Sequence, residues 1–143
     1  MGDARSKQID AYIQRDPFAR LLGADVEIVK PGHSRVTLVI TGDMVNFHGQ
    51  THGGVVFGLG DLAFAAASNS RGQTAVALNV AITFLKATTA GDVLIAEAAE
   101  QSASGPMALY DITIKNAGTG ELVAKSQDLV YRKKEWFVPA DTA

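Results

Sequence analysis

The chain contains no cysteine, and this absence excludes several kinds of site. Disulfide bonds, zinc centres held by thiolates and cysteine nucleophiles are all ruled out. The chain also lacks an uninterrupted apolar segment of the roughly 20 residues that a membrane helix needs. Its first residues have no apolar core of the kind found in secretion signals. We therefore expect a cytoplasmic protein that does not interact with a membrane.

An excess of positive charge is missing as well. There are 13 basic and 15 acidic side chains, which gives a formal charge of −2 and no basic stripe that could bind nucleic-acid phosphates. With 143 residues, 47% of them hydrophobic, the chain can form one core but not two. We expect a single domain over residues 1–143, with a helical extension over 1–16, a loose tail over 136–143 and no nucleic-acid partner.

What is present is a clear alternation of apolar and polar residues. Helical spacing over residues 9–13 predicts a first short helix. An aspartate followed by proline at 16–17 predicts the start of a second one, which would end at Gly23. Alternating or β-branched segments separated by turn residues predict six strands. We place these strands at residues 24–30, 34–41, 75–86, 93–102, 107–115 and 122–131.

Between the second and third strands, residues 53–70 are small and apolar, and Asp61 is their only charged residue. A helix that is apolar on all sides is normally surrounded by protein, so we expect a central helix. Gly58 and Gly60 each weaken a helix interior by about 1 kcal/mol relative to alanine. We expect another backbone to approach them closely. One such helix with an antiparallel sheet makes an α+β domain.

A polar, glycine-rich loop over residues 46–54 leads into this helix. The first N–H groups of a helix lack internal partners and carry the positive end of its dipole. Gly53 and Gly54 leave these donors uncovered, as in an oxyanion hole, which suggests acyl transfer. Asp61 is the second signal, because an unpaired carboxylate costs several kcal/mol in apolar surroundings. The alternative for Asp61 is a buried aspartate that caps or pairs locally.

The spacing of these two signals predicts a dimer. Gly53 and Asp61 are eight residues apart, or about 12 Å along a helix. Reacting atoms must come within about 3–3.5 Å. Two copies of the helix, packed antiparallel across a two-fold axis, would bring Gly53 of one chain towards Asp61 of the other. A single helix also cannot cover both faces of a six-stranded sheet, which favours association too.

Asn46, His52, Gly53, Gly54 and Asp61, with the Ala-Ser-Asn-Ser segment at 67–70, resemble the hotdog-fold acyl-CoA thioesterases of the phenylacetic-acid-degradation type. The resemblance extends over about residues 18–132. It implies a central helix wrapped by a curled antiparallel sheet of about six strands, with active sites between two subunits and dimers paired into a tetramer. It makes Asp61 the nucleophile or general base and Gly53 N–H the oxyanion donor. Asn46 and His52 would orient water and an aromatic or medium-sized acyl thioester.

The same resemblance implies a set of substrate-binding residues. Asn79 stands where the family often has a serine or threonine that faces the site. The pantetheine arm of coenzyme A would lie along two segments, residues 84–86 and 104–106, and cations would meet its phosphates. The substrate-binding residues are therefore Asn79, Phe84, Leu85, Lys86, Gly105 and Arg132, with Arg71, Lys133 and Lys134 as further available cations.

No metal or other cofactor is expected. His48 and His52 would share a helical face only if their loop were helical, which Gly49 discourages, and His33 is more typical of a surface histidine. Two other functions remain open. A hotdog dehydratase or hydratase would use His52 as its acid or base, and a non-catalytic sensor would bind acyl-CoA in the same pocket without turnover.

Overall fold

The computed structural model describes residues 3–140. Its elements are, in order, α1 (Ala4–Ile13), α2 (Pro17–Leu22), β1 (Asp25–Lys30), β2 (His33–Val39), the 3-10 turn η1 (Gly42–Met44), α3 (Gly53–Ser68), β3 (Gln73–Phe84), β4 (Val93–Ser104), β5 (Met107–Asn116) and β6 (Leu122–Trp136). Each helix and strand expected from the sequence is present, with ends that differ by a few residues. Within residues 3–140, no helix has both the length and the apolar character needed to cross a bilayer.

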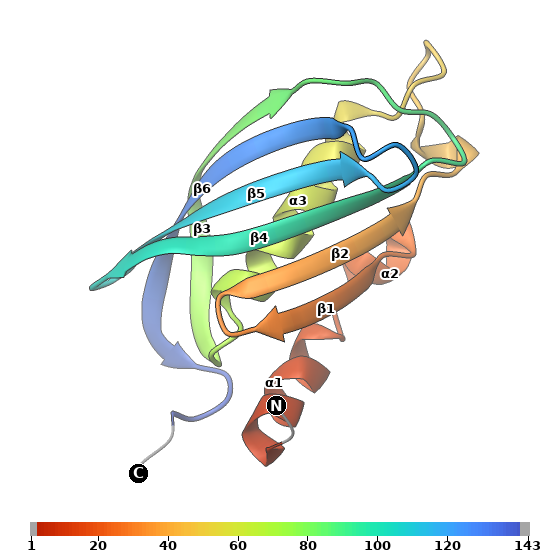
Figure 1. The fold of residues 1–143 in the computed structure, drawn as a ribbon. Helices are drawn as coiled ribbons and strands as arrows, with labels where there is room; N and C mark the ends of the chain where they lie inside the picture. The colour runs from red at the N-terminus through yellow and green to blue at the C-terminus, as the bar shows by residue number, and fades with distance from the viewer. Residues whose placement is uncertain (1–2, 141–143) are drawn as a thin grey trace.

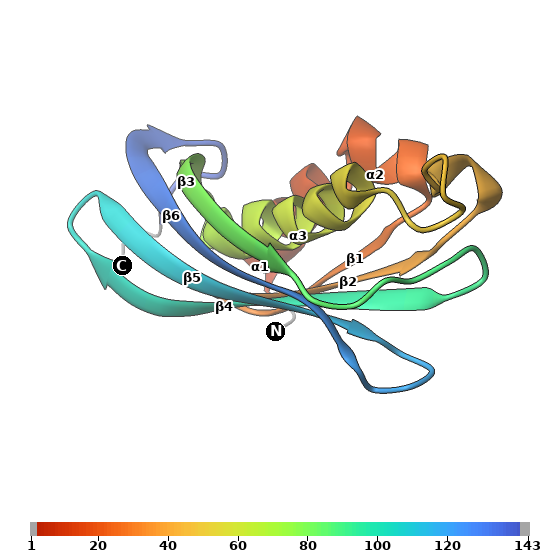
Figure 2. The ribbon, with the colours of Figure 1, turned by 90° about the horizontal axis from the view of Figure 1, so that it is seen from above.

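The six strands form one antiparallel sheet in the order β1-β2-β4-β5-β6-β3. The sheet curls around α3, which lies in its concave side together with the N-terminal helices (Figures 1 and 2). The predicted α+β class is therefore confirmed. The alanine-rich segment at 93–102 also suits a helix by propensity, but Ala96 pairs with Val36 on one side and Ile114 on the other. Pairing on both sides overrides local propensity.

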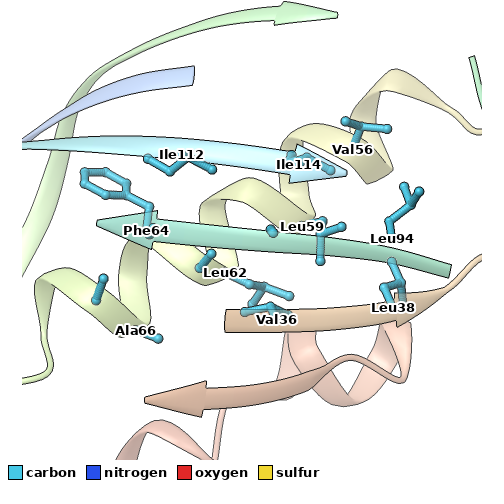
Figure 3. Close-up of a cluster of buried hydrophobic side chains, with 14 of the residues drawn as sticks. Val36, Leu38, Val56, Leu59, Leu62, Phe64, Ala66, Leu94, Ile112 and Ile114 are labelled. Atoms are coloured by element: carbon cyan, nitrogen blue, oxygen red, sulfur yellow. The ribbon is translucent and has the colours of Figure 1, made fainter. Parts of the chain in front are cut away.

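The core lies between α3 and the concave face. Alternate residues of β2, β4 and β5 point inward and meet one stripe of the helix (Figure 3). The central members of this core are Val36, Leu38, Leu59, Ala63, Phe64, Leu94, Ala96, Ile112 and Ile114, all nearly inaccessible to water. Ala63 on the helix and Ala96 on β4 are small and let the helix lie close to the strands, and this packing fixes the direction in which both helix ends point.

The helix glycines are packed against side chains. A Cβ atom on Gly58 would lie 3.0 Å from the Phe18 ring, and one on Gly60 would lie 3.3 Å from Ile114 Cδ1. The expectation of a close backbone was therefore wrong in its detail. The space that each glycine leaves is filled by a side chain from α2 or β5.

Polar groups cover the convex face of the sheet. Arg35 lies 3.4 Å from Glu97, and Lys125 lies 2.7 Å from Asp111. These ion pairs lie on the face that the sequence argument expected a second copy of the chain to cover. Among the exposed apolar side chains, Leu78 on β3 is 52% exposed, and β3 has β6 as its only neighbour in the sheet.

The C-terminal segment is attached over its described part. The N–H of Phe137 donates to Gly72 O at 2.9 Å, and its ring stacks on Tyr12 with the ring centroids 4.5 Å apart. Val138 is only 5% exposed. Residues 136–140 are therefore not the loose tail expected from the sequence. Residues 141–143 lie outside the described residues.

The contact between Gly60 and Ile114 gives a stability prediction. Gly60→Leu would force a branched side chain into a filled core, and overpacking of this kind costs about 1–3 kcal/mol. We expect this loss in the free energy of unfolding measured by urea denaturation. Gly42→Ala is the control, because no atom lies within 4 Å of the added methyl. Equal stability of Gly60→Leu and wild type would contradict the described packing.

Candidate active site

The N-terminus of α3 presents one uncovered backbone donor. His52 is the N-cap, and its Nδ1 accepts a hydrogen bond from Gly54 N–H at 2.9 Å. Gly54 is thus already engaged, which corrects the expectation that both glycine N–H groups are available. Gly53 N–H is exposed and has no partner in the part of the chain that the structure describes. It lies at the positive end of the helix dipole, where an oxyanion is stabilised.

Asn46 shapes the loop that precedes this helix. Its Oδ1 accepts from His48 N–H at 2.9 Å and from Gln50 N–H at 3.2 Å. Its own N–H donates to Gln50 O at 2.7 Å. The side-chain Nδ2 makes no hydrogen bond within residues 3–140, so this group alone is available to a ligand. The loop is anchored at its far end, where Thr88 Oγ1 donates to Thr51 Oγ1 at 2.7 Å.

Asp61 has no hydrogen bond or ion pair within residues 3–140, and its side chain reaches the surface of the single chain. The protein around it withdraws water and, with a smaller contribution from the charge of Asp16, raises the pKa of Asp61 above its ordinary value. Gly53 and Asp61 belong to one regular helix, so they remain about 12 Å apart along its axis. One chain does not bring them together.

A pocket of about 290 Å³ opens beside Gly53. Its lining includes three predicted substrate-binding residues, Phe84, Leu85 and Lys86. The Phe84 ring lies 3.8 Å from the position that a Cβ of Gly53 would take. Lys86 Nζ is paired with Glu121 Oε2 at 2.5 Å, so its charge is partly compensated. The structure thus brings these three residues and Gly53 into one place.

Gly105 and Arg132 lie elsewhere. Arg132 donates to the carbonyl of Gly105, and its backbone N–H donates to Pro106 O at 2.6 Å. Arg132 pairs with Ala75 near the start of β3, whereas Phe84 is the last residue of that strand. Nine residues of strand span about 30 Å. Within one chain, this pair is therefore remote from the pocket beside Gly53.

Asn79 lies on the face of the sheet opposite to Asp61. An irregularity between Ala77 and Asn79 shifts the register, so that Asn79 pairs with Leu129 and Val80 pairs with the inward-facing Asp128. Because neighbouring side chains of a strand alternate between faces, Asn79 points to the convex side. Within its own chain, Asn79 therefore does not face Asp61, and its predicted role as a residue facing the site stays a prediction.

Sequence reasoning missed Asp128. It lies on the inner face of β6 and is only 1% exposed. Its carboxylate accepts a hydrogen bond from Ser126 Oγ, and no cation pairs with it within residues 3–140. Burial raises the pKa of Asp128 to about 6, with a further contribution from the charge of Asp61. The inner face of β6 therefore holds a buried acid that the sequence pattern did not reveal.

The other histidines do not form a site with these residues. His33 Nε2 lies 3.3 Å from Glu97 Oε2, and the His48 ring lies beside the exposed Phe47 ring. Among residues 3–140, no group of three or more histidines and carboxylates is placed to hold a metal ion. Arg71, one of the predicted phosphate-binding cations, is bound to Glu100 at 2.7 Å.

A family model described as the thioesterase superfamily matches residues 48–123, which contain the helix, the pocket and both candidate groups. The chain belongs to the thioesterase superfamily. As a member of the thioesterase superfamily it is a thioester hydrolase, which confirms the enzyme class predicted from the sequence.

Relatives of known structure support the same assignment. The chain is 41% identical to the acyl-coenzyme A thioesterase PaaI of Escherichia coli over 106 residues, 74% of this chain and 76% of the relative. The solved structure of E. coli PaaI, from the phenylacetic acid degradation operon, matches with a TM-score of 0.87 and 35% identity over 92% of this chain and 96% of its own. The predicted hotdog fold and the predicted resemblance are confirmed.

A third comparison concerns a bound ligand. The structure of a Streptococcus mutans protein with bound acetyl-CoA matches this chain with a TM-score of 0.73 and 28% identity. The match covers 77% of this chain and 88% of the S. mutans chain. The acetyl-CoA is bound to the S. mutans protein.

The raised pKa of Asp128 predicts a pH-dependent penalty on stability. Its pKa is about 6 in the folded chain, against an ordinary value of 3.8. Between pH 3.8 and pH 6 the folded chain therefore binds this proton more tightly than the unfolded chain does. Stability therefore falls as pH rises through this window, and the cost above pH 6 is about 3 kcal/mol. We expect Asp128→Asn to unfold at higher urea than wild type at pH 8. At pH 3, where both side chains are neutral, the difference should vanish, and a variant less stable at pH 8 would contradict this account.

Proposed function

We propose that this thioester hydrolase is an acyl-CoA thioesterase that works as a homodimer at minimum. The observation that carries the proposal is the Gly53 N–H beside a pocket, on the same helix as the carboxylate of Asp61, with neither group bonded to any residue between 3 and 140. The E. coli relative is named an acyl-coenzyme A thioesterase, and the S. mutans structure has acetyl-CoA bound. Both support acyl-CoA as the substrate class.

In this reaction the thioester carbonyl lies against Gly53 N–H. The helix dipole and this donor stabilise the negative charge that develops on the carbonyl oxygen. Asp61 attacks the carbonyl carbon or removes a proton from the attacking water. The carbon–sulfur bond breaks, coenzyme A leaves as its thiol, and water supplies the oxygen of the carboxylic acid. Asn46 Nδ2, the unengaged donor of the loop, orients the water or the thioester.

Dimer formation supplies what one chain lacks. The strand β3 is at the sheet edge, and its exposed apolar residues and unpaired backbone groups favour addition of another strand. Two-fold antiparallel pairing of β3 with its copy would bring the end of one strand to the start of the other. The pocket beside Gly53 would then approach the partner's Arg132 and the partner's Gly105. This would unite the two halves of the predicted coenzyme A site.

The acyl group has a separate candidate pocket. A cavity of about 490 Å³ lies between α1, α2 and α3, and its lining includes Tyr12, Phe137, Leu62 and Ala65. Leu62 follows Asp61 in the chain, and Ala65 is one helical turn further along. The lining also includes Arg15, Asp16, Asn69 and Thr74, and its apolar and aromatic part suits an aromatic or medium-sized acyl group. His52 Nδ1 is occupied by its cap hydrogen bond, which disfavours it as the base of a dehydratase or hydratase.

Loss of the Asp61 carboxylate gives the main test. Asp61→Asn keeps the size of the side chain but removes the nucleophile or base, so release of coenzyme A should fall by about a hundredfold or more. The measurement is thiol release from phenylacetyl-, benzoyl- and fatty acyl-CoAs, with Asp25→Asn as the control on an exposed strand. Acyl-CoA binding by both proteins, with no release by wild type, would identify a sensor instead.

Mixing two inactive variants tests the composite site. Gly53→Pro removes the oxyanion donor and should fold, because proline suits the first helical position and His52 before it has an extended ψ of 135°. In hybrids of Gly53→Pro with Asp61→Asn, one of two sites regains both groups. Random exchange should therefore restore about a quarter of wild-type activity. No recovery in verified hybrid dimers would show that both groups act within one chain.

A further inference from the structure

One stripe of α3 is left uncovered by the rest of the chain. From residue 56 to residue 69, every residue is buried except Phe57, Asp61, Ala65 and Asn69. These four recur at every fourth position, so they follow one another along one side of the helix. Because Asp61 is one of them, a second copy of the chain can reach its carboxylate only from this side.

The cavity of about 490 Å³ continues this stripe. Ala65 and Asn69 belong to its lining, together with Leu62, which follows Asp61 in the chain. The cavity therefore begins within about one helical turn of the candidate catalytic carboxylate and extends towards the C-terminal end of α3. A partner chain that covers the stripe would also border this cavity.

Phe47 lies in the loop that leads into α3, and its side chain is 94% exposed. The loop is held in place, because Gly49 N–H donates to Asn46 O at 2.9 Å and Thr89 Oγ1 donates to Gly49 O at 3.2 Å. Figure 1 shows this loop projecting past the start of α3. Exposed apolar side chains are common, so exposure alone assigns no role to Phe47. Its position in the proposed dimer does.

The two-fold axis determines where this loop lies. An axis that brings Gly53 of one chain beside Asp61 of the other passes near Phe57, the residue midway between them. Phe57 is 40% exposed and lies on the uncovered stripe, so its ring would meet its own copy. Because the two helices would be antiparallel, the segment before α3 of one chain would extend along the partner helix from Asp61 towards Asn69. The loop would then lie over the partner's cavity.

We propose that Phe47 determines acyl specificity across the dimer, by closing the cavity of the partner subunit and packing against the acyl group bound there. The inference rests on the proposed function. The cavity already has an aromatic wall, because the rings of Tyr12 and Phe137 stack with their centroids 4.5 Å apart. A third ring would enclose a flat apolar acyl group from another side. Each site then takes its oxyanion donor and this ring from one chain, and its carboxylate and the rest of the cavity from the other.

A comparison of two substrates tests the role of the ring. Phe47→Ala should lower kcat/KM for phenylacetyl-CoA by about tenfold or more, because the acyl group loses an apolar contact and stays open to water. The fall for acetyl-CoA, whose acyl group is too short to fill the cavity, should be much smaller. Phe47→Leu keeps an apolar side chain and should recover most of the loss. Equal falls for both substrates would indicate general damage to the loop and would overturn the proposal.

Hybrid dimers show from which chain Phe47 acts. In a hybrid of Gly53→Pro with Asp61→Asn, the one complete site takes its oxyanion donor from the Asp61→Asn chain and its cavity from the Gly53→Pro chain. Phe47→Ala placed in the Asp61→Asn chain should remove the preference for phenylacetyl-CoA over acetyl-CoA. The same change placed in the Gly53→Pro chain should retain that preference. The opposite result, or no difference between the two hybrids, would overturn the proposal.

A further readout does not require turnover. The chain contains no cysteine, so Phe47→Cys introduces one thiol whose alkylation rate reports how far it is covered. A saturating thioether analogue of phenylacetyl-CoA should slow this alkylation severalfold. It should leave alkylation of Lys30→Cys unchanged, because Lys30 is exposed on β1, at the sheet edge opposite β3.

The two failures are distinguishable. Protection of the Phe47→Cys thiol, in a protein whose wild type hydrolyses no acyl-CoA, would support closure of the cavity and overturn the proposed function. Hydrolysis by wild type, with no protection of this thiol, would overturn the role of Phe47 and leave the proposed function in place.

Discussion

The close packing of α3 against the concave face of the sheet determines the rest of the structure. Small residues on the helix let it lie near the inward-facing side chains of β2, β4 and β5. This contact fixes the direction of the helix axis. The axis in turn determines where Gly53 N–H, at the start of the helix, and the Asp61 carboxylate, near its middle, can point. A polar group on such a helix is held rigidly by its neighbours, which is what a preorganised site requires.

The same packing makes charge expensive near the helix. Asp61 reaches the surface of the single chain, and Asp128 is buried on the inner face of β6; neither has a cation as partner within residues 3–140. Some other carboxylates are paired with cations, as Glu100 is with Arg71 and Asp111 is with Lys125. The contrast separates carboxylates that have a cation as partner from these two, and of the two only Asp128 is buried. Natural proteins tolerate such costs mainly where function requires them.

Much of this arrangement could be read from the sequence, because alternation and capping are local signals. Apolar residues at alternate positions predicted the strands, and Asp16, Pro17 and Gly23 predicted the limits of α2, where Asp16 accepts from Phe18 N–H at 2.9 Å. Features that depend on the register between strands could not be predicted from the sequence. A bulge near residue 78 moves Asn79 to the convex face, and one residue of shift is enough to reverse a side chain.

The segment from Lys125 to Asp128 illustrates the same limit. Its four consecutive polar residues contain no alternation, so no pattern reveals which two point inward. Only pairing with both neighbouring strands places Ser126 and Asp128 in the core. In the same way, the attachment of residues 137–140 depends on Gly72 and Tyr12, which are far away in the sequence.

Helix and strand geometry extend these constraints beyond the single chain. A side chain cannot span the eight residues between Gly53 and Asp61, and nine residues of β3 separate the pocket beside Gly53 from Arg132. Both separations start at the pocket beside Gly53 and lead away from it in the same direction. The first runs along α3 to Asp61, and the second runs along β3 to Arg132. A two-fold axis that reverses β3 also reverses α3, so one symmetry operation would close both gaps. Because one two-fold axis would shorten both distances, the geometry favours a symmetric dimer over a rearrangement within the chain.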